Sequence, residues 1–227
     1  MVRAVALIPA AGFGTRFHDD GPKALVTLAG RPMLVHALER LAASNRVREA
    51  VIAISPGHSD AFREALADAP VPCTLVDGGV TRRDSVVRAF AAARFESDDD
   101  LVLVHDAARP LVDPVEVAAV VDAAEKSGAA IAGYSIVETV KRVSGGVVGG
   151  TVPRGDLFAA TTPQVFRAGL FRSAVTKEGG PDATDDAELV ERTGGTVTVV
   201  LTSRWNIKIT YPEDLDWAEA FLARAGT

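Results

Sequence analysis

The chain has little of what several classes of protein need. It carries one cysteine, Cys73, in 227 residues, so it can form no intrachain disulfide, and a cysteine-rich zinc site is not expected. Acidic side chains outnumber basic ones, 30 to 24, and the net charge of −6 argues against a general nucleic-acid or anionic-membrane surface. No apolar run approaches the ~18 residues of a membrane span, and the N-terminus lacks the pattern of a secretory signal. These absences predict a cytoplasmic protein that binds neither nucleic acid nor membrane.

The composition is otherwise that of a globular protein, with 48% hydrophobic and 24% charged residues. Short apolar runs alternate with stretches of helical period as far as residue 135. This alternation predicts an α/β fold with a doubly wound, mostly parallel sheet, in a single domain over residues 1–227. Strands are expected at about 2–8, 50–55, 73–76, 101–104 and 129–135, and helices at about 33–43, 59–66, 81–94 and 113–127.

The alternation breaks after residue 135. Two runs rich in valine, 137–143 and 147–152, flank Gly145 and Gly146, which is the pattern of a β-hairpin. The hairpin is either an ordinary sheet edge or an arm that pairs with a second subunit, and we expect a dimerisation arm over about residues 137–153. Beyond it we expect strands at 161–166 and 197–201, helices at about 169–176, 185–192 and 212–222, and a capping box from Thr210 to Glu213 before the last helix.

The first candidate site is the stretch that follows the first predicted strand. Gly12 and Gly14 let backbone N–H groups approach a bulky ligand, and Arg16 and Lys23 add fixed positive charge. The stretch is not a Walker A loop, and Phe17 occupies the third glycine position of a dinucleotide fingerprint. It predicts a phosphate-binding loop of another kind, with a plain glycine turn as the alternative.

Two further clusters follow later strands. Ligands of an open α/β sheet bind beyond the carboxyl ends of its strands, so both clusters should meet the first loop. Residues 77–85 join a glycine pair to a helix N-terminus, where Ser85 could read a base edge, although a simple capped helix has the same pattern. Asp106 is placed to hold Mg²⁺ against phosphates, or else to serve as a turn residue. No nucleophilic triad surrounds any histidine, and we expect His105, the neighbour of Asp106, to be structural, with contact to the substrate as the alternative.

The motifs together resemble those of a known family. They are Pro9–Arg16, Pro22-Lys23, Gly78-Gly79 with Arg82 and Asp84-Ser85, His105–Pro110, Thr139-Val-Lys141, Thr162-Pro-Gln164, Thr184-Asp-Asp186 and Asn206-Ile-Lys208. In this order they are similar to those of the 2-C-methyl-D-erythritol 4-phosphate cytidylyltransferases of the non-mevalonate isoprenoid pathway. The resemblance implies a Rossmann-like nucleotidyltransferase fold, transfer of a cytidylyl group from CTP to methylerythritol phosphate, release of pyrophosphate, Mg²⁺ as cofactor and a homodimer.

The resemblance also implies a role for individual residues. The expected catalytic residues are Arg16, Lys23, Lys208 and, from the arm of the other subunit, Arg154. The residues expected to hold CTP are Pro9, Ala10, Ala11, Gly12, Gly14, Gly79, Arg82, Ser85, Asp106 and Ala107, with Asp106 also the expected metal ligand. Those expected to grip the acceptor are Arg109, Thr139, Arg154, Thr162 and Lys208.

One position departs from the family pattern, and two other functions stay open. An acidic residue often precedes Asn-Ile-Lys in the family, but Trp205 stands here, so Asp106 is the single carboxylate expected at the metal. A relative that uses ribitol 5-phosphate would keep the same CTP loops. A non-catalytic nucleotide-binding regulator is the third hypothesis, which the joint presence of Arg16, Lys23 and Lys208 disfavours.

Overall fold

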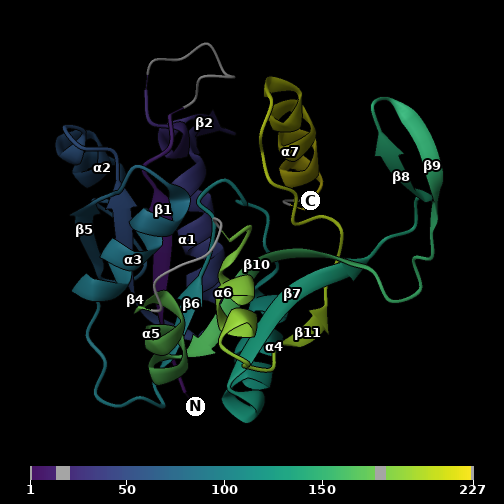
Figure 1. The fold of residues 1–227 in the computed structure, drawn as a ribbon. Helices are drawn as coiled ribbons and strands as arrows, with labels where there is room; N and C mark the ends of the chain where they lie inside the picture. The colour runs from purple at the N-terminus through teal and green to yellow at the C-terminus, as the bar shows by residue number, and fades with distance from the viewer. Residues whose placement is uncertain (1, 14–20, 177–182, 226–227) are drawn as a thin grey trace.

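The computed structural model describes residues 2–13, 21–176 and 183–225 (Figure 1). Its centre is a seven-stranded sheet in the order β11-β7-β10-β6-β1-β4-β5. Strand β10 runs antiparallel to both of its neighbours, and the other neighbouring pairs are parallel, which confirms the predicted mostly parallel sheet. The strands are β1 (Ala4–Ala10), β4 (Val47–Ile54), β5 (Cys73–Asp77), β6 (Leu101–Val104), β7 (Ala129–Ser135), β10 (Phe158–Arg167) and β11 (Thr198–Leu201).

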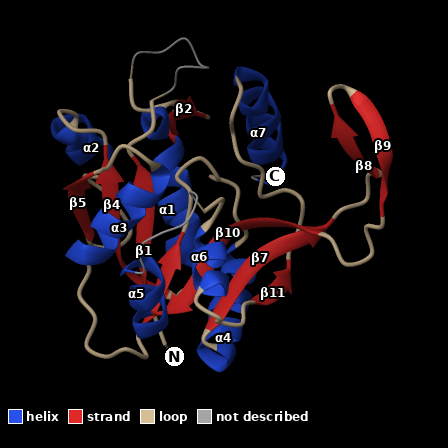
Figure 2. Cartoon of the chain, viewed as in Figure 1, coloured by secondary structure: helices blue, strands red, loops and turns tan. Residues whose placement is uncertain are grey.

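Helices cover both faces of this sheet, as Figure 2 shows. Successive side chains of a strand point to opposite faces, so Ala6 and Ile8 of β1 join one core and Val5 and Leu7 join the other. The helices α1 (Met33–Ala43), α2 (Ser59–Ala65) and α4 (Pro114–Ser127) pack into the first core, and α3 (Arg82–Ala92), α5 (Ala168–Thr176) and α6 (Asp186–Arg192) into the second. Helix α7 (Pro212–Ala225) packs through Ala218 into a third, smaller cluster. The sheet is therefore doubly wound.

Polar side chains cap the starts of α3 and α7. The cap predicted for α7 is wrong. Thr81 and Asp84 form a reciprocal capping box at the start of α3. At α7 the predicted partner is Glu213, but the carboxylate of Asp214 accepts the backbone N–H groups of Thr210 and Tyr211, at 2.6 and 2.8 Å. The helix begins at Pro212, so the third helical residue, from which a capping acid reaches back, is Asp214.

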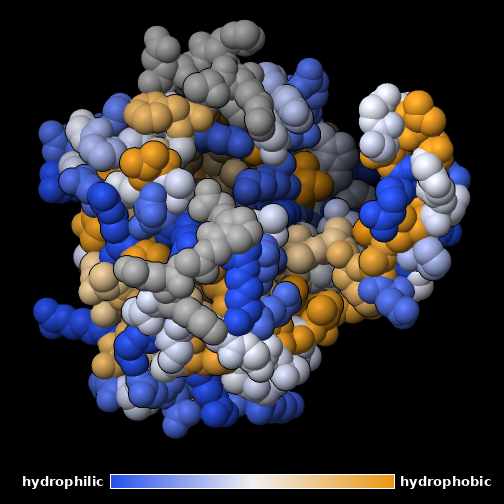
Figure 3. Space-filling model, in the orientation of Figure 1, coloured by the Kyte–Doolittle hydropathy of each residue, from blue (hydrophilic) through white to orange (hydrophobic). Residues whose placement is uncertain are grey.

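The predicted hairpin is present as a separate two-stranded sheet of β8 (Val140–Ser144) and β9 (Val147–Val152). Gly145 and Gly146 have φ of 54° and 80°, the left-handed conformation of a two-residue hairpin turn. The arm projects away from the main sheet (Figure 1), and apolar side chains gather on it in Figure 3. An isolated two-stranded hairpin is only marginally stable in water, so the arm is suited to packing against another surface.

Two short strands, β2 (Thr27–Leu28) and β3 (Arg31–Pro32), pair with each other, and the 3₁₀ helix η2 (Lys23–Leu25) precedes them. Within the described residues, every helix is too short or too polar to cross a bilayer.

Candidate active site

A cavity of about 130 Å³ lies where the loops after β1 and β6 meet, at the carboxyl ends of these strands. The backbone N–H of Lys23 donates to the Gly12 carbonyl at 3.0 Å, which places η2 beside the first loop. The cavity therefore brings together seven of the predicted site residues. Its lining consists of Pro9, Ala10, Gly12, Lys23, Ala24, Asp106, Ala107, Ala108 and Lys208.

A chain of ion pairs begins in this cavity and leads into the protein. Lys208 Nζ lies 2.8 Å from Asp106 Oδ2, and Arg82 Nε donates to Asp106 Oδ1 at 2.9 Å. The same guanidinium donates through Nη1 to Asp186 Oδ2 at 2.8 Å. Both carboxylates are buried, whereas the Lys208 side chain is 44% exposed. The cations thus face the open side, and the second carboxylate lies behind them.

The two carboxylates that share Arg82 have pKa values shifted in opposite directions. Burial alone would raise the pKa of Asp106, but Arg82 and Lys208 outweigh it and hold that pKa well below its usual range. Burial raises the pKa of Asp186, and Arg82 offsets only part of this effect. Burial would lower the pKa of Arg82, but the two carboxylates raise it instead. The pKa values differ because Arg82 and Lys208 both act on Asp106, whereas Asp186 has Arg82 alone to offset its burial and the negative charges of Asp106 and Asp185.

Buried neighbours hold the Asp106 loop in place. The backbone N–H of Asp106 donates to Thr162 Oγ1 at 3.1 Å, and this hydroxyl also bonds to His105 Nδ1 at 3.2 Å. The other ring nitrogen of His105 bonds to the Arg109 carbonyl at 3.1 Å. Burial lowers the pKa of His105 to about 4, so the ring is neutral at pH 7. His105 is a structural residue of this loop.

A second set of bonds fixes the segment that carries Lys208. The Asn206 amide donates to the Thr162 carbonyl at 2.7 Å, and Arg109 Nη1 donates to the Asn206 carbonyl at 2.6 Å. The Ile209 N–H donates to the Ala108 carbonyl at 2.8 Å. Arg109 and Thr162, two expected acceptor-binding residues, thus tie the Lys208 segment to the Asp106 loop, and neither lines the cavity.

The glycine pair after β5 packs closely against the first loop and against the start of α3. A Cβ added to Gly78 would lie 2.3 Å from the Ala11 Cβ, and one on Gly79 would lie 2.1 Å from the Asp84 Cβ. The Ser85 hydroxyl accepts from the Gly79 N–H at 3.1 Å and donates to the Thr81 carbonyl at 3.0 Å. These contacts require glycine at both positions. The hydroxyl of Ser85 maintains the loop, and its contact with a base stays a prediction.

Comparison with known proteins identifies the family. A family model described as 2-C-methyl-D-erythritol 4-phosphate cytidylyltransferase matches residues 4–224. The chain belongs to this family. It is 39% identical to the enzyme of that name from Acidobacterium capsulatum over 97% of this chain and 98% of the relative, and 42% identical to the one from Rhodopirellula baltica over 95% and 93%.

Solved structures of the family share the fold. The 2-C-methyl-D-erythritol 4-phosphate cytidylyltransferase from Thermus thermophilus is 38% identical, with a TM-score of 0.78 over 99% of this chain and 100% of that one. A 4-diphosphocytidyl-2C-methyl-D-erythritol synthase from Anaerococcus prevotii is 28% identical, with a TM-score of 0.86 over 98% and 99%. The predicted fold and the predicted family are therefore both confirmed.

Four expected residues of the family site have no described place beside the cavity. Gly14 and Arg16 lie outside the described residues. Thr139 and Arg154 are exposed residues that flank the arm strands, and neither lines the cavity. Their contact with a substrate stays a prediction that involves a second subunit.

The donor set at the cavity suits a Mg²⁺ ion held mainly by phosphates. The described residues contain no group of three or more His, Cys, Asp or Glu side chains that could hold a metal by themselves. Asp106 offers one hard carboxylate beside Lys23 and Lys208, which are suited to phosphate oxygens. Mg²⁺ commonly takes one or two carboxylates and fills its shell with phosphate oxygens and water, so the site fits this ion.

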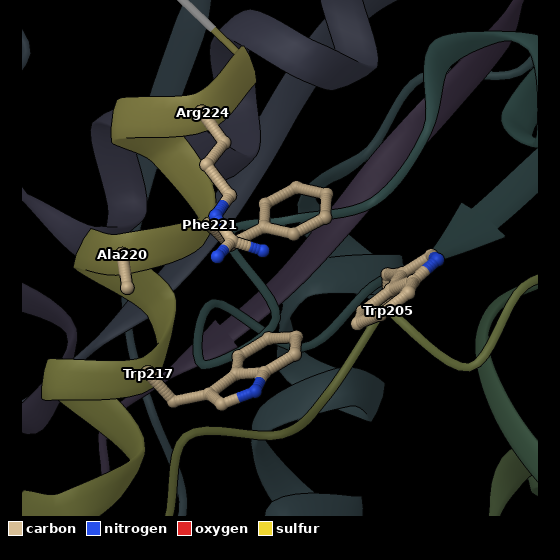
Figure 4. Close-up of a pocket in the computed structure, with 5 residues that line it drawn as sticks. All are labelled: Trp205, Trp217, Ala220, Phe221 and Arg224. Atoms are coloured by element: carbon tan, nitrogen blue, oxygen red, sulfur yellow. The ribbon is translucent and has the colours of Figure 1, made fainter.

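The residue that departs from the family pattern belongs to an aromatic cluster. Trp205 stacks on Trp217 with ring centroids 5.6 Å apart and an interplanar angle of 16°, and the Phe221 centroid lies 5.6 Å from that of Trp205. Figure 4 shows Trp205 on a loop facing Trp217 and Phe221 of α7. With Ala220 and Arg224 these rings line a cavity of about 490 Å³. The position thus offers an apolar surface in place of a second carboxylate.

Two buried polar residues of the site received no role from the sequence. Asp186 pairs with Arg82, and Gln164 Oε1 accepts the backbone N–H groups of Asp186 and Ala187 at 3.1 and 3.0 Å. Both belong to motifs that carry the family resemblance. The available signal was Gln164 directly before the apolar Val165 and Phe166 of a predicted strand, because a buried glutamine is unfavourable unless its amide is bonded.

Proposed function

We propose that the chain transfers the cytidylyl group of CTP to 2-C-methyl-D-erythritol 4-phosphate, in the non-mevalonate pathway of isoprenoid precursor synthesis. A phosphate oxygen of the acceptor forms a bond to the α-phosphorus of CTP, and the bond from that phosphorus to the bridging oxygen breaks. The products are 4-(cytidine 5′-diphospho)-2-C-methyl-D-erythritol and pyrophosphate. The observation that carries the proposal is the meeting of Lys23, Lys208 and Asp106 in one cavity of a chain that belongs to this family.

The cations of the site serve this reaction by stabilising negative charge. Negative charge builds on the phosphate oxygens and on the departing pyrophosphate, and preorganised positive groups stabilise it. Lys208 would release Asp106 and turn its ammonium to the acceptor phosphate. Lys23, with Arg16 from outside the described residues, would face the triphosphate. The acceptor phosphate is already anionic at pH 7, so the step needs no general base.

Asp106 would hold Mg²⁺ together with the phosphates of CTP. The ion neutralises phosphate charge when it is bound. The low pKa of Asp106 supports this role, because the carboxylate stays ionised at every physiological pH. Its present partners, Arg82 and Lys208, can both transfer their hydrogen bonds to phosphate oxygens.

We also propose that the active enzyme is a homodimer whose arm completes the site of its partner. Residues 139–155 contain three basic side chains, Lys141, Arg142 and Arg154, and no acidic one. Helix α7 contains four acidic residues and one arginine. The aromatic cluster beside α7 would receive the exposed valines of the arm. Trp205 precedes Lys208 by three residues, so an arm seated there would bring Arg154 and Thr139 towards the acceptor.

The cytoplasm is the proposed location of the enzyme. Its lone cysteine, Cys73, fits a reducing compartment, because proteins of oxidising compartments are often stabilised by disulfides, which need two cysteines.

The acceptor is tested by pyrophosphate release with CTP and Mg²⁺, run in parallel with methylerythritol phosphate and ribitol 5-phosphate. We expect release with methylerythritol phosphate. Release with ribitol 5-phosphate alone would keep the transfer chemistry and contradict the proposed acceptor. CTP binding without release from either acceptor would favour the regulatory alternative.

A further inference from the structure

Arg82 is held from two sides, and only one of its partners belongs to the cavity. Its Nε donates to Asp106, which lines the cavity, and its Nη1 donates to Asp186, which is 2% exposed and is not part of the lining. A metal ion in the cavity would compete with Arg82 for the Asp106 carboxylate, and a phosphate would compete with Asp106 for the Arg82 guanidinium, whereas Asp186 does not line the cavity. The second contact can therefore persist while CTP binds.

Asp186 is itself fixed by rigid elements. It is the first residue of α6, and Gln164 of β10 accepts its backbone N–H. The Gln164 amide nitrogen donates to Asp185 at 2.9 Å, and the Asp185 side chain caps the same helix by accepting the Glu188 N–H. A carboxylate anchored in this way offers one fixed acceptor to a long, flexible arginine.

We propose that Asp186 is a positioning residue that holds the Arg82 guanidinium at the start of α3 while CTP binds. The inference rests on the proposed role of Arg82 in holding CTP. Arginine loses considerable side-chain freedom when it is fixed, and a buried acceptor removes that freedom before the ligand arrives. Without Asp186, Arg82 would pair with Asp106 alone and would compete with the metal for that carboxylate.

The test compares Asp186→Asn with a matched control, Asp113→Asn. Asn keeps the size of the side chain and removes its charge. Asp113 also stands at a helix start, where it accepts the Val115 N–H at 2.8 Å, but it has no contact with Arg82. For Asp186→Asn we expect KM and the calorimetric Kd for CTP to rise about tenfold, which corresponds to about 1.4 kcal/mol, with a smaller change in kcat. The control should leave both constants near those of the wild type.

Two more variants separate positioning from a general loss of structure. Asp186→Glu keeps the charge and should recover part of the CTP affinity, and it serves as the test if Asp186→Asn does not fold. In an Arg82→Ala background, Asp186→Asn should weaken CTP binding no further, because both changes remove one interaction. Unfolding temperatures of all variants show whether the fold is kept.

The outcomes are distinct. CTP affinity equal to that of the wild type in folded Asp186→Asn would overturn the inference, and so would a full further loss in the Arg82→Ala background. If the wild type binds CTP but turns over neither acceptor, the proposed reaction fails and the inference is still decided by the Kd values. If the wild type does not bind CTP, both fail.

Discussion

At the scale of single residues, the site depends on the balance of charge around Asp106. Arg82 and Lys208 contact its carboxylate, Arg109 Nε lies 3.9 Å from it, and Lys23 lines the same cavity. Positive charge is thus concentrated at one point of a chain whose net charge is −6. Such a local cluster lets an acidic protein bind a triphosphate.

Replacing Lys23 by alanine should lower kcat far more than CTP affinity. One preorganised charge on a developing anion is typically worth about 2.7–4 kcal/mol, or about 10²–10³ in rate. Steady-state kinetics with a separate measurement of CTP binding tests this. Lys126→Ala, at an exposed lysine in the last turn of α4, is the matched control and should leave kcat unchanged. Near-wild-type kcat in Lys23→Ala would remove Lys23 from the mechanism.

His105 should make the fold less stable in acid. Its pKa of about 4 in the fold lies below the ordinary 6.5, so between these values the unfolded chain binds the proton and the folded chain does not. The free energy of unfolding therefore falls as pH falls from 6.5 to 4, by roughly 3 kcal/mol from this residue. Urea unfolding of the wild type and of His105→Gln at pH 7, 5.5 and 4 measures this change in the free energy of unfolding. The variant should lose less stability on acidification, and parallel curves would contradict the account.

At the scale of elements, the site is built by loops that the parallel strands deliver to one edge. Strands β1, β5 and β6 end there, and the loops after β1 and β5 touch at Gly78, where a side chain would not fit. The site therefore depends on close backbone packing as well as on its charges.

Alanine at Gly79 should disrupt the CTP loop. The added methyl would lie 2.1 Å from the Asp84 Cβ, so the loop or the start of α3 must shift. Overpacking of this kind typically costs about 1–3 kcal/mol. Thermal unfolding and CTP titration should both show the loss. Gly155→Ala is the control, because nothing lies within 4 Å of a Cβ there and its φ is not left-handed. Equal behaviour of the two variants would show that the close packing at Gly79 is unimportant.

The elements were predictable from the sequence because their signals are local. Short runs of apolar residues predicted β6 and β7, and Asp113 followed by a proline predicted the start of α4. The capping residue of α7 was predicted wrongly because two neighbouring acids, Glu213 and Asp214, could each cap the helix. The start of the helix at Pro212 decides in favour of Asp214. Asp186 and Gln164 received no role because their partners are far apart in sequence: Arg82 precedes Asp186 by 104 residues. The resemblance placed the site residues, but it could not show that Arg109 and Thr162 bond to Asn206 and do not line the cavity.

At the scale of the whole molecule, the arm is the least buried element. It forms a sheet of its own, apart from the seven-stranded sheet. Its residues 141–151 are all exposed, and Val143, Val147 and Val148 are more than half exposed. The aromatic cluster, which contains both tryptophans of the sequence, is the apolar surface suited to it. Two copies related by a twofold axis would make this contact twice.

Mixing two inactive variants should restore activity if the arm acts across subunits. Arg154→Ala damages only the arm, and Lys208→Ala damages only the body. A mixed dimer then has one intact site, so random exchange of equal amounts should give about a quarter of the wild-type activity. The measurement is pyrophosphate release after exchange, with each variant alone as the control. Activity no greater than the sum of the two variants would indicate a site built from one chain.

The most direct test of the central claim is ³¹P NMR of the wild type and Lys208→Ala with CTP, Mg²⁺ and methylerythritol phosphate. The account predicts that the wild type forms a new diphosphate diester and pyrophosphate at equal rates, and that Lys208→Ala slows both together by about 10²-fold or more. Pyrophosphate without the diester would contradict the transfer reaction, and an unchanged rate in Lys208→Ala would contradict the assigned site.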